Sequence, residues 1–422
     1  MTLPPKKISF SYRLLTASGL ESTLKRELDS IAPHLKSALS ISRGSVQIRS
    51  ELFDRFDVAS NFMDEFVSDV VLRSRVLNGV RIGLGEAFTA KWEQQASEAM
   101  RGLPWKMFYH KASPVPAVFV KSKTSRLFVP SHVRSLVEDA FKEYQGQSIF
   151  QQLQHRPIGA SSEAASPRIF VQVEQDRFQF EVDAGGKMLN NFGLDRYNCD
   201  SRLDLAENSS AAIAIRSLSR LIDGFTEPTI VWDPFCGGGQ LILTAARALS
   251  GIPAGSPAID YCFKSFPVHS PIVFASKVNA LRLEPHKNGS SISRFYATDS
   301  SPEAVEVMRR NLATFNAGLP EQSNGTGIMP FEIQVDRLPE AYTPPPVGKV
   351  CILTALPSKG DTERKYKKFH SLVDHLDKEN RLAGCVAATS KSNMFRKLSS
   401  RRWLTELRFF DGRREVEVLS LV

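Results

Sequence analysis

Residues 229–246, TIVWDPFCGGGQLILTAA, constrain the fold more than any other part of this chain of 422 residues. The first four positions are apolar or β-branched, which is typical of a strand buried inside a parallel sheet. Gly237 to Gly239 then allow a sharp turn and a close approach of the backbone to a ligand. Apolar residues follow at helical spacing from Leu241. A strand that enters a helix through such a turn points free backbone N–H groups at a ligand, so the segment predicts an α/β fold with a binding loop.

The residues in and after this loop indicate which class of ligand it could hold. A dinucleotide fingerprint needs a glycine where Ile242 stands and an acid about 20 residues further on, after a second strand. Asp260 lies near that distance but in a turn-rich stretch, GIPAGSPAID, and the Gly-Lys-Ser/Thr of a phosphate loop is absent. The form Asp-Pro-Phe-x-Gly-x-Gly instead resembles the S-adenosylmethionine loop of class I methyltransferases; the alternative is a turn that only links strand to helix. The resemblance implies cofactor contacts from Asp233, Phe235, Gly237 and Gly239.

Composition and charge limit the class of protein. A hydrophobic content of 42% supports packed cores, and the net charge of +9 suits a polyanionic partner such as RNA. The five cysteines show neither zinc-ligand spacing nor a disulfide framework, so we expect no metal site and a reducing compartment. No apolar run reaches the roughly 18 residues of a membrane span. We expect the cytoplasm, with the mitochondrial matrix as the alternative because Lys6, Lys7 and Arg13 precede the first acid, Glu21.

The pattern of apolar residues predicts three consecutive segments. The first, residues 1–78, reads as a small α+β unit, and the second, 79–189, as another with a hairpin around Asp176. The third, 190–422, alternates strands and helices, has an irregular surface insertion at 251–291, and ends in a hairpin around Asp411. This order predicts a doubly wound sheet with one antiparallel C-terminal strand. Residues 116–141 are expected to form a strand, a basic turn and then a helix. The other expected strands are 8–16, 44–50, 70–77, 168–175, 177–184, 229–232, 293–299, 331–335, 350–354, 383–389 and two within 404–422. The other expected helices include those at 20–31, 52–63, 92–100, 207–222 and from 302.

Nearly the whole chain resembles the THUMP-containing RNA methyltransferases. Within that family it most resembles the bacterial large-subunit rRNA guanine-N2 enzymes. RLLTASGLESTLKRELDSI resembles their N-terminal ferredoxin-like segment, and KSKTSRLFVPSHVRSLVEDAF resembles the THUMP signature. VDAGGKMLNNFGLDRYN stands at their domain-joining stretch and keeps Arg196 and Tyr197, while IPAGSPAIDYCFKSFPVHS resembles an insertion after their glycine loop. The resemblance implies a ferredoxin-like segment over 1–78, a THUMP-like RNA-binding domain over 79–189 and a Rossmann-like class I methyltransferase domain over 190–422.

The resemblance also implies roles for three acids. Asp299, at the end of the second strand of the third segment, would accept from both ribose hydroxyls of the cofactor, as a carboxylate can. The alternative is a cap for the helix that begins at Pro302. Asp336 would accept from the adenine amino group, or else be a solvated turn residue. Asp233 would orient the cofactor near its methionine end.

The chain departs from the family at the catalytic loop, which reads Asn-Pro-Pro-Tyr in those enzymes. There the Asn and a backbone carbonyl accept from the exocyclic amine of the base, and the aromatic ring stacks on it. Here the segment is LTALPSKGD, so Ala355, Leu356 and Ser358 replace Asn, Pro and Tyr, and only Pro357 remains. Pro357 and Ser358 are therefore the candidate catalytic positions, without the side-chain acceptor and without the ring.

Basic residues predict contacts with RNA. Lys121, Lys123 and Arg126 occupy the strand–helix turn of the second segment and suit a phosphate backbone. For each charged run alone, a solvated helix face is the alternative, and Trp403 is expected in the core. Two further basic groups are Arg364, Lys365, Lys367 and Lys368, and Arg396, Lys397, Arg401 and Arg402.

Two functions remain open. The first is an S-adenosylmethionine-dependent RNA methyltransferase acting on a guanine amino group of rRNA, favoured by the glycine loop. The second is a catalytically inactive RNA-binding factor of ribosome biogenesis, favoured by the altered LTALPSKGD loop. In both, the partner is RNA, either rRNA or a ribosomal precursor, and no membrane is involved. The sequence makes no prediction of the oligomeric state.

Overall fold

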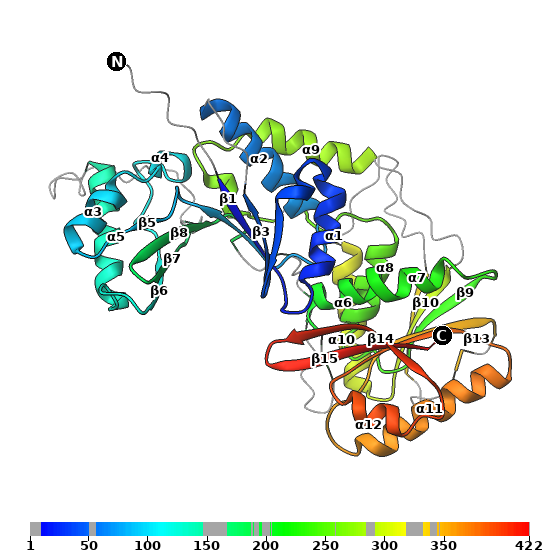
Figure 1. Cartoon of the computed structure of the whole chain (residues 1–422). Coiled ribbons are helices and arrows are strands. Elements are labelled where there is room, and N and C mark those ends of the chain that lie inside the picture. Colours follow the sequence, from blue (N-terminus) through cyan, green and yellow to red (C-terminus); the bar gives the residue numbers. More distant parts are fainter. Residues whose placement is uncertain are drawn as a thin grey trace. The chain divides into compact units, whose positions relative to one another are not determined.

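The computed structural model divides the chain into two compact units, coloured along the sequence in Figure 1. The first unit holds residues 1–15, 25–189 and 255–280, and the second holds 16–24, 190–254 and 281–422. The structure describes residues 10–49, 56–146, 167–186, 189, 194, 195, 203, 205–257, 259–283, 292–317, 332–337, 344, 345 and 347–421. Arg196 and Tyr197, which the sequence analysis names, lie outside these ranges.

An eight-stranded sheet forms the centre of the first unit. Its strands follow the order β2-β3-β1-β4-β8-β7-β6, and β5 pairs with β8. Neighbouring strands are antiparallel except β6 and β7, which are parallel. The strands are β1 (Ser11–Leu15), β2 (Leu39–Ser42), β3 (Ser45–Arg49), β4 (Gly79–Gly83), β5 (Phe88–Thr89), β6 (Val118–Lys123), β7 (Ile169–Glu174) and β8 (Arg177–Asp183). The expected hairpin around Asp176 is confirmed as β7 and β8.

The two faces of this sheet differ in polarity because side chains alternate along each strand. Tyr12, Ile82 and Val182 lie opposite one another in register and are each at most 1% exposed, so they belong to the apolar face. Helix α5 (Pro130–Gln145) contacts β6 and buries Val133 and Val137. The other helices of this unit are α2 (Phe56–Arg73), α3 (Glu93–Arg101), α4 (Trp105–Phe108), α9 (Pro271–Leu283) and the 3-10 turns η1 (Pro33–Ala38) and η4 (Cys262–Ser265), while α1 (Glu21–Ile31) begins in the second unit and continues into the first.

Two expectations for this unit are wrong. The strand expected over 70–77 does not form, because α2 continues to Arg73. The buried residues of α2 recur at the spacing of one helix face, and this helical period overrides the local preference of valine for strands. These residues are Met63, Phe66, Val67, Val70 and Val71.

The insertion expected to be irregular instead contains η4 and α9 and packs within the first unit. The Gly255 amide donates to the Leu72 carbonyl at 2.9 Å, and Lys277 pairs with Asp69 at 2.7 Å. The buried His269 ring lies 2.6 Å from the Asp64 carboxylate. Contacts with α2 that no local pattern reveals therefore order this segment.

A seven-stranded sheet forms the centre of the second unit, in the order β11-β10-β9-β12-β13-β15-β14. The first five strands are parallel, and β15 is antiparallel to both of its neighbours. The expected doubly wound sheet with one antiparallel strand is confirmed. The strands are β9 (Thr229–Asp233), β10 (Ile292–Asp299), β11 (Glu332–Arg337), β12 (Lys349–Ala355), β13 (Leu382–Thr389), β14 (Trp403–Asp411) and β15 (Arg414–Leu421).

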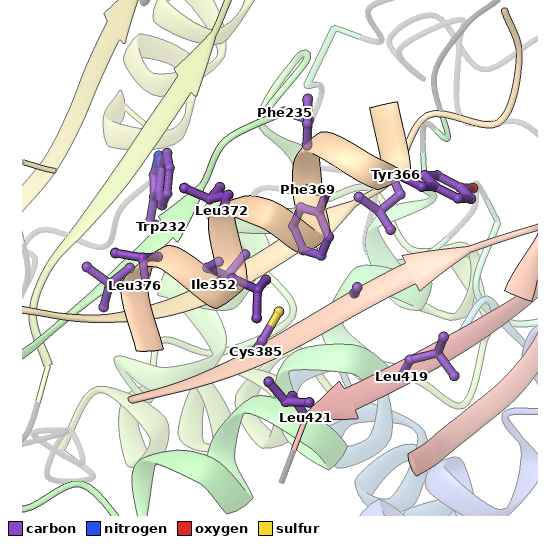
Figure 2. Close-up of a cluster of buried hydrophobic side chains, with 14 of the residues drawn as sticks. Trp232, Phe235, Ile352, Tyr366, Phe369, Leu372, Leu376, Cys385, Leu419 and Leu421 are labelled. Atoms are coloured by element: carbon purple, nitrogen blue, oxygen red, sulfur yellow. The ribbon is translucent and has the colours of Figure 1, made fainter. Parts of the chain in front are cut away.

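Helices pack on both faces of this second sheet. On one face, Tyr366, Phe369, Leu372 and Leu376 of α11 (Thr362–Lys378) point at the strands, as Figure 2 shows. On the other, Leu221 of α7 (Ser219–Ile222) lies against Gly384, beside Cys351. The expected helix over 207–222 is present, with a π-helical turn in its middle. The other helical elements of this unit are α6 (Glu207–Ile213), the π-turn η3 (Ala214–Leu218), α8 (Gln240–Leu249), α10 (Pro302–Ala317) and α12 (Ser392–Lys397). Within the described part of the chain, no helix is both long and apolar enough to cross a membrane.

Candidate cofactor site

The glycine turn lies between β9 and α8, as the sequence predicts. Gly237 and Gly239 have φ values of 54° and 84°, a left-handed conformation that glycine adopts without strain. A Cβ at Gly239 would lie 1.8 Å from Sδ of Met308 in α10. α10 can therefore pack against the turn because residue 239 has no side chain. This packing requirement for glycine was not predicted from the sequence.

Asp233 ends β9 and is 1% exposed. Its Oδ1 accepts from the Phe235 amide at 3.1 Å and from the Thr354 hydroxyl at 2.7 Å. The carboxylate thus fixes the first turn of the loop and joins it to β12. Thr354 was not singled out in the sequence because a threonine inside an apolar strand has no local signal of function.

Asp299 lies at the end of β10, directly beside the glycine turn. Its Oδ2 accepts from the Gly237 amide at 3.1 Å, and its Oδ1 accepts from the Ser301 amide at 2.9 Å. The Ser301 hydroxyl in turn accepts from the Ala304 amide at 3.2 Å, as the side-chain cap of α10. The Asp299 carboxylate therefore supports both the glycine turn and Ser301, the residue that caps the helix. The two roles predicted for Asp299, in the cofactor site and at the start of α10, concern the same place in the fold.

Asp336 lies on β11, where it is paired in register with Thr298 of β10. Its Oδ2 accepts from the Gln334 side chain at 2.6 Å. Burial, followed by a hydrogen bond and the negative charge of Asp336, raises the pKa of Tyr296 to about 12. Tyr296 is therefore a protonated donor at neutral pH, and Asp336 is a strand residue with polar partners rather than part of a solvated turn.

Asn311 holds the loop from α10 and was missed in the sequence. Its Nδ2 donates to the carbonyls of Gly238 at 2.6 Å and Asp195 at 2.8 Å, and its Oδ1 accepts from the Asp195 amide at 2.7 Å. The side chain of Gln240 also donates to the Asp195 carbonyl, at 2.6 Å. A polar residue on the inward stripe of α10, three positions after the buried Met308, is the signal that could have identified Asn311.

A small pocket opens at this turn. Its volume is about 20 Å³, which is close to the space of one water molecule. Leu203 and Leu205, which are 4% and 2% exposed, form part of its wall. A ligand of nucleoside size would therefore have to displace part of this wall. The other lining residues are Asp233, Phe235, Cys236, Gly237, Gly238, Gln240, Leu241 and Ala355.

The ring of Phe235 also belongs to a hydrophobic cluster, although the residue lines this pocket. It is 9% exposed, and its centroid lies 6.5 Å from that of Phe369 in α11. Figure 2 shows Phe235 beside the first turns of α11. The backbone of Phe235 therefore contributes to the loop, while its side chain contributes to the core.

The altered catalytic loop follows β12 directly. Ala355 lines the pocket, so a methyl group stands at the position of the expected side-chain acceptor. Leu356 is fully buried in the hydrophobic cluster, and its amide donates to the Ala388 carbonyl at 2.8 Å. Pro357 is buried and Ser358 is 7% exposed, and Asp361 then caps α11 by accepting from the Arg364 amide at 3.2 Å. Leu356, the second of the four residues aligned with Asn-Pro-Pro-Tyr, therefore anchors the altered catalytic loop in the hydrophobic core.

The expected RNA-binding residues of the first unit are exposed at the end of β6 and in the turn after it. Lys123 lies 4.0 Å from Glu174, and the Arg126 guanidinium lies 5.0 Å from the centroid of the exposed Trp92 ring. Asp176 orders the turn, because its Oδ1 accepts from the Ser125 hydroxyl and the Arg126 amide at 2.8 and 2.7 Å. The same two hydrogen bonds lower the pKa of Asp176, with the Arg126 amide making the larger contribution.

Two of the four residues in the basic group around Trp403 form ion pairs within the protein. Arg396 pairs with Glu417 at 2.6 Å, and Arg401 pairs with Asp374 at 2.5 Å. Trp403 is 4% exposed, which confirms the expectation that it lies in the core. Arg396 and Arg401 therefore have structural partners within the second unit. Arg364, Lys367 and Lys368 remain exposed on α11.

No metal site is visible in the parts of the chain that the structure describes. Among the histidines in those parts, His370 donates from Nε2 to the Phe395 carbonyl at 2.9 Å, and burial lowers its pKa. The four cysteines that the structure describes, Cys236, Cys262, Cys351 and Cys385, form no disulfide bond with one another.

Comparison with known proteins adds to this geometry. No family model matches the chain. The sheet and loop of the second unit form a Rossmann-like methyltransferase fold, as comparison with solved structures shows. Among curated proteins, the ribosomal RNA large subunit methyltransferase K/L of Vibrio parahaemolyticus serotype O3:K6 (strain RIMD 2210633) is 26% identical over 153 residues. The match spans 36% of this chain and 20% of that protein, so this chain aligns with about a fifth of its relative.

Three solved structures are similar over almost the full chain. SMU.472, described as a methyltransferase and solved in complex with SAH, has a TM-score of 0.71 at 16% identity, with 98% of both chains covered. A protein from Listeria monocytogenes str. 4b F2365, described as an N6-adenine-specific DNA methylase, has a TM-score of 0.69 at 16% identity, covering 97% of this chain and 96% of its own. TrmN from Thermus thermophilus has a TM-score of 0.60 at 15% identity, covering 98% of this chain and 100% of its own. At these identities the likeness concerns the fold.

Proposed function

We propose that this protein is an S-adenosylmethionine-dependent methyltransferase that acts on RNA. The observation that carries the proposal is the 3.1 Å hydrogen bond from the Gly237 amide to the Asp299 carboxylate. It joins the glycine turn after β9 to the acid after β10 at the carboxyl edge of the sheet. Ligands of open α/β sheets bind at this edge, near the point where the strand order reverses. The complex of SMU.472 with SAH supports this choice of ligand for the fold.

The cofactor contacts follow from these positions. Asp233 and the backbone from Phe235 to Gly239 would hold the methionine end, and Asp299 would accept from the ribose hydroxyls. Each carboxylate oxygen can accept more than one hydrogen bond, so Asp299 can keep its two amides and still bind a hydroxyl. Asp336 would accept from the adenine amino group. When bound, the cofactor supplies an electrophilic methyl group on sulfur.

The protein's own residues would contribute hydrogen-bond acceptors to the reaction. The Pro357 carbonyl and the Ser358 hydroxyl would accept from a guanine amino group in rRNA and keep positive charge from building on that nitrogen. Acid–base assistance of this kind is typically worth about 10²–10⁴-fold in rate. The methyl group of Ala355 offers no acceptor at the pocket, so we expect slow transfer compared with an enzyme that has an amide there.

A second function is favoured by one specific observation. Leu356 is fully buried in the hydrophobic cluster, at the position where the resemblance implies the first proline of the catalytic loop. A loop held in the core in this way suits a protein that binds RNA and the cofactor without transferring a methyl group. That protein would be a methyltransferase-like factor of ribosome biogenesis.

The RNA partner is proposed from charge and from the relatives. Lys121, Lys123 and Arg126 would contact phosphates from the first unit, and the named relatives include an rRNA methyltransferase. The ferredoxin-like and THUMP-like assignments of residues 1–78 and 79–189 remain part of this proposal. So does the location, the cytoplasm or alternatively the mitochondrial matrix.

Two measurements test the proposal. Isothermal calorimetry with S-adenosylhomocysteine measures the cofactor site, and methyl transfer to rRNA from cells that lack the protein measures chemistry. Uptake of the ligand together with labelled rRNA supports the enzyme, whereas uptake without transfer to any RNA fraction supports the inactive factor. Absence of uptake at millimolar concentration would contradict both forms of the proposal.

The role of the basic turn is tested separately. Lys121→Ala, Lys123→Ala and Arg126→Ala should weaken rRNA binding and reduce its salt dependence, because each removes a phosphate contact. Lys142→Ala is the matched control, since the side chain of this lysine is 44% exposed and lies on α5, the helix that contacts β6. Equal affinities for all four variants would contradict the assignment.

A further inference from the structure

The polar face of the eight-stranded sheet carries a hollow that the cofactor site does not involve. Its volume is about 790 Å³, and it is lined from strands β1, β3, β7 and β8 and from residues 85–87. This volume lies in the range of small-molecule sites. Its strand-borne polar residues are Ser11, Arg13, Gln47, Gln172, Glu174, Arg177, Gln179 and Glu181.

The edge strand β6 extends this hollow. Phe119, Lys121 and Lys123 alternate with buried or half-buried positions and are exposed. In register they are paired with Phe170, Gln172 and Glu174 of β7, respectively. Because paired residues of neighbouring strands share a face, the exposed ring and both lysines lie on the same side of the sheet as the hollow.

The charge inside the hollow is largely balanced. Glu181 is 6% exposed and lies 3.0 Å from Arg13 and 3.6 Å from Arg81. Burial, partly offset by these two arginines, raises the pKa of Glu181. Around this ion pair stand three neutral amides, those of Gln47, Gln172 and Gln179. Each donates one N–H to a neighbouring side chain, Ser42, Glu174 and Glu181 respectively, at 3.2 to 3.5 Å, and each also has a second N–H and a carbonyl oxygen. A planar, uncharged group with mixed donors and acceptors is the complement of such a wall.

An aromatic platform adjoins the amides. The Phe119 ring is 48% exposed and is stacked on Phe170, with centroids 5.3 Å apart and planes inclined by 19°. The Arg81 guanidinium lies 3.5 Å from the centroid of Phe170. An exposed ring backed by a second ring and a cation is a surface on which a nucleobase can stack. Lys121 and Lys123 follow at two-residue steps along the same edge, where a phosphate backbone would pass.

We infer that this face binds an unpaired stretch of RNA, with a splayed base in the hollow against the glutamine amides and a second base stacked on Phe119. The inference rests on the proposed function, since it names how the first unit would hold the RNA substrate. Bases in a duplex hide their Watson–Crick edges and their ring faces, so only single-stranded RNA fits this arrangement.

Fluorescence anisotropy of the full chain tests the inference. The probes are a labelled single-stranded RNA decamer and a hairpin whose stem contains the same sequence. Phe119→Ala should weaken decamer binding by about 5- to 100-fold, as expected for the loss of one stacked base, and Phe119→Tyr should restore it. The double variant Gln172→Ala/Gln179→Ala should also weaken it, with an unchanged salt slope. Lys121→Ala and Lys123→Ala should each lower the salt slope by about 0.7.

The control variant lies in the same unit as Phe119. Ile272→Ala on α9 removes an apolar side chain that is more exposed than Phe119, 82% against 48%, and should leave decamer binding unchanged. Decamer affinity that is unaltered in Phe119→Ala and in the glutamine variant would overturn the inference, and so would a hairpin that binds as tightly as the decamer. Calorimetry with S-adenosylhomocysteine separates this from the proposed function: Phe119-dependent decamer binding without ligand uptake supports the hollow and contradicts methyl transfer.

Discussion

The Gly237 amide and the Asp299 carboxylate, 62 residues apart in the chain, are joined by a hydrogen bond of 3.1 Å. One oxygen of Asp299 supports the glycine turn, and the other accepts from the Ser301 amide at the start of α10. The geometry of the loop therefore depends on a fully buried acid of the neighbouring strand.

Asp299→Asn should weaken binding of S-adenosylhomocysteine by at least about tenfold. The substitution keeps the shape but turns an amide N–H toward a backbone donor, which should also lower the free energy of unfolding by about 1–3 kcal/mol. Calorimetry and urea unfolding measure the two effects. Glu303→Gln is the control, because this exposed carboxylate accepts from the Ser301 hydroxyl and from its own backbone amide. A folded Asp299→Asn variant with unaltered affinity would remove Asp299 from the proposed site.

Gly239→Ala should lower the free energy of unfolding by about 2–4 kcal/mol. Its positive φ of 84° costs about 1 kcal/mol for any residue with a Cβ, and the new methyl group meets the buried Met308 side chain. Gly412→Ala isolates the first contribution, since Gly412 has a φ of 63° and no heavy atom within 4 Å of the added Cβ. Chemical denaturation of both variants gives the difference. Equal losses at the two positions would show that Met308 moves aside without cost.

Ala355→Asn should increase methyl transfer, by about 10- to 100-fold if the substrate already reaches the loop. The new amide would supply the side-chain acceptor at a position that lines the pocket. Single-turnover transfer to rRNA measures the change. Ala355→Leu matches the volume without the acceptor and should not increase the rate. An equal response to Asn and Leu would attribute the change to packing, and the combination with Ser358→Tyr tests the missing stacking ring.

Glu417 should make the second unit sensitive to acid. Burial raises its pKa, but hydrogen bonds from Ser392, Thr405 and Arg396 outweigh this and lower the pKa to about 2. A depressed pKa stabilises the folded state above the unfolded value, near 4.5, and this stabilisation is lost as the pH falls from 4.5 toward 2.

The loss should amount to about 1–2 kcal/mol after allowing for partial solvent screening. Thermal unfolding between pH 7 and pH 3 measures it, and Glu417→Gln should remove the dependence over this range. Glu415→Gln, two residues earlier on the same strand and exposed, is the control. A Glu417→Gln protein with the same acid sensitivity as the unaltered one would contradict the assignment.

Local patterns predicted most elements of the second unit. The strand–turn–helix of β9 and α8, the acid at the end of β10 and the C-terminal hairpin each have a signature within a few residues, and all are present. The strand expected over 70–77 failed because valines at helical spacing also read as a β-branched run. The ordered helix α9 was missed because its partners, such as Asp69, lie some 200 residues earlier.

The sequence by itself determined the order of strands and helices, the glycine turn and the absence of an amide side chain at Ala355. These depend on periodicity and residue type, which are local properties of a chain. Only the tertiary structure decided that Asn311 holds Gly238, that Leu203 and Leu205 narrow the pocket, and that Phe119 adjoins a hollow lined by Gln172. Such contacts join distant residues, and they arise from packing and strand register, which fix which side chains share a face.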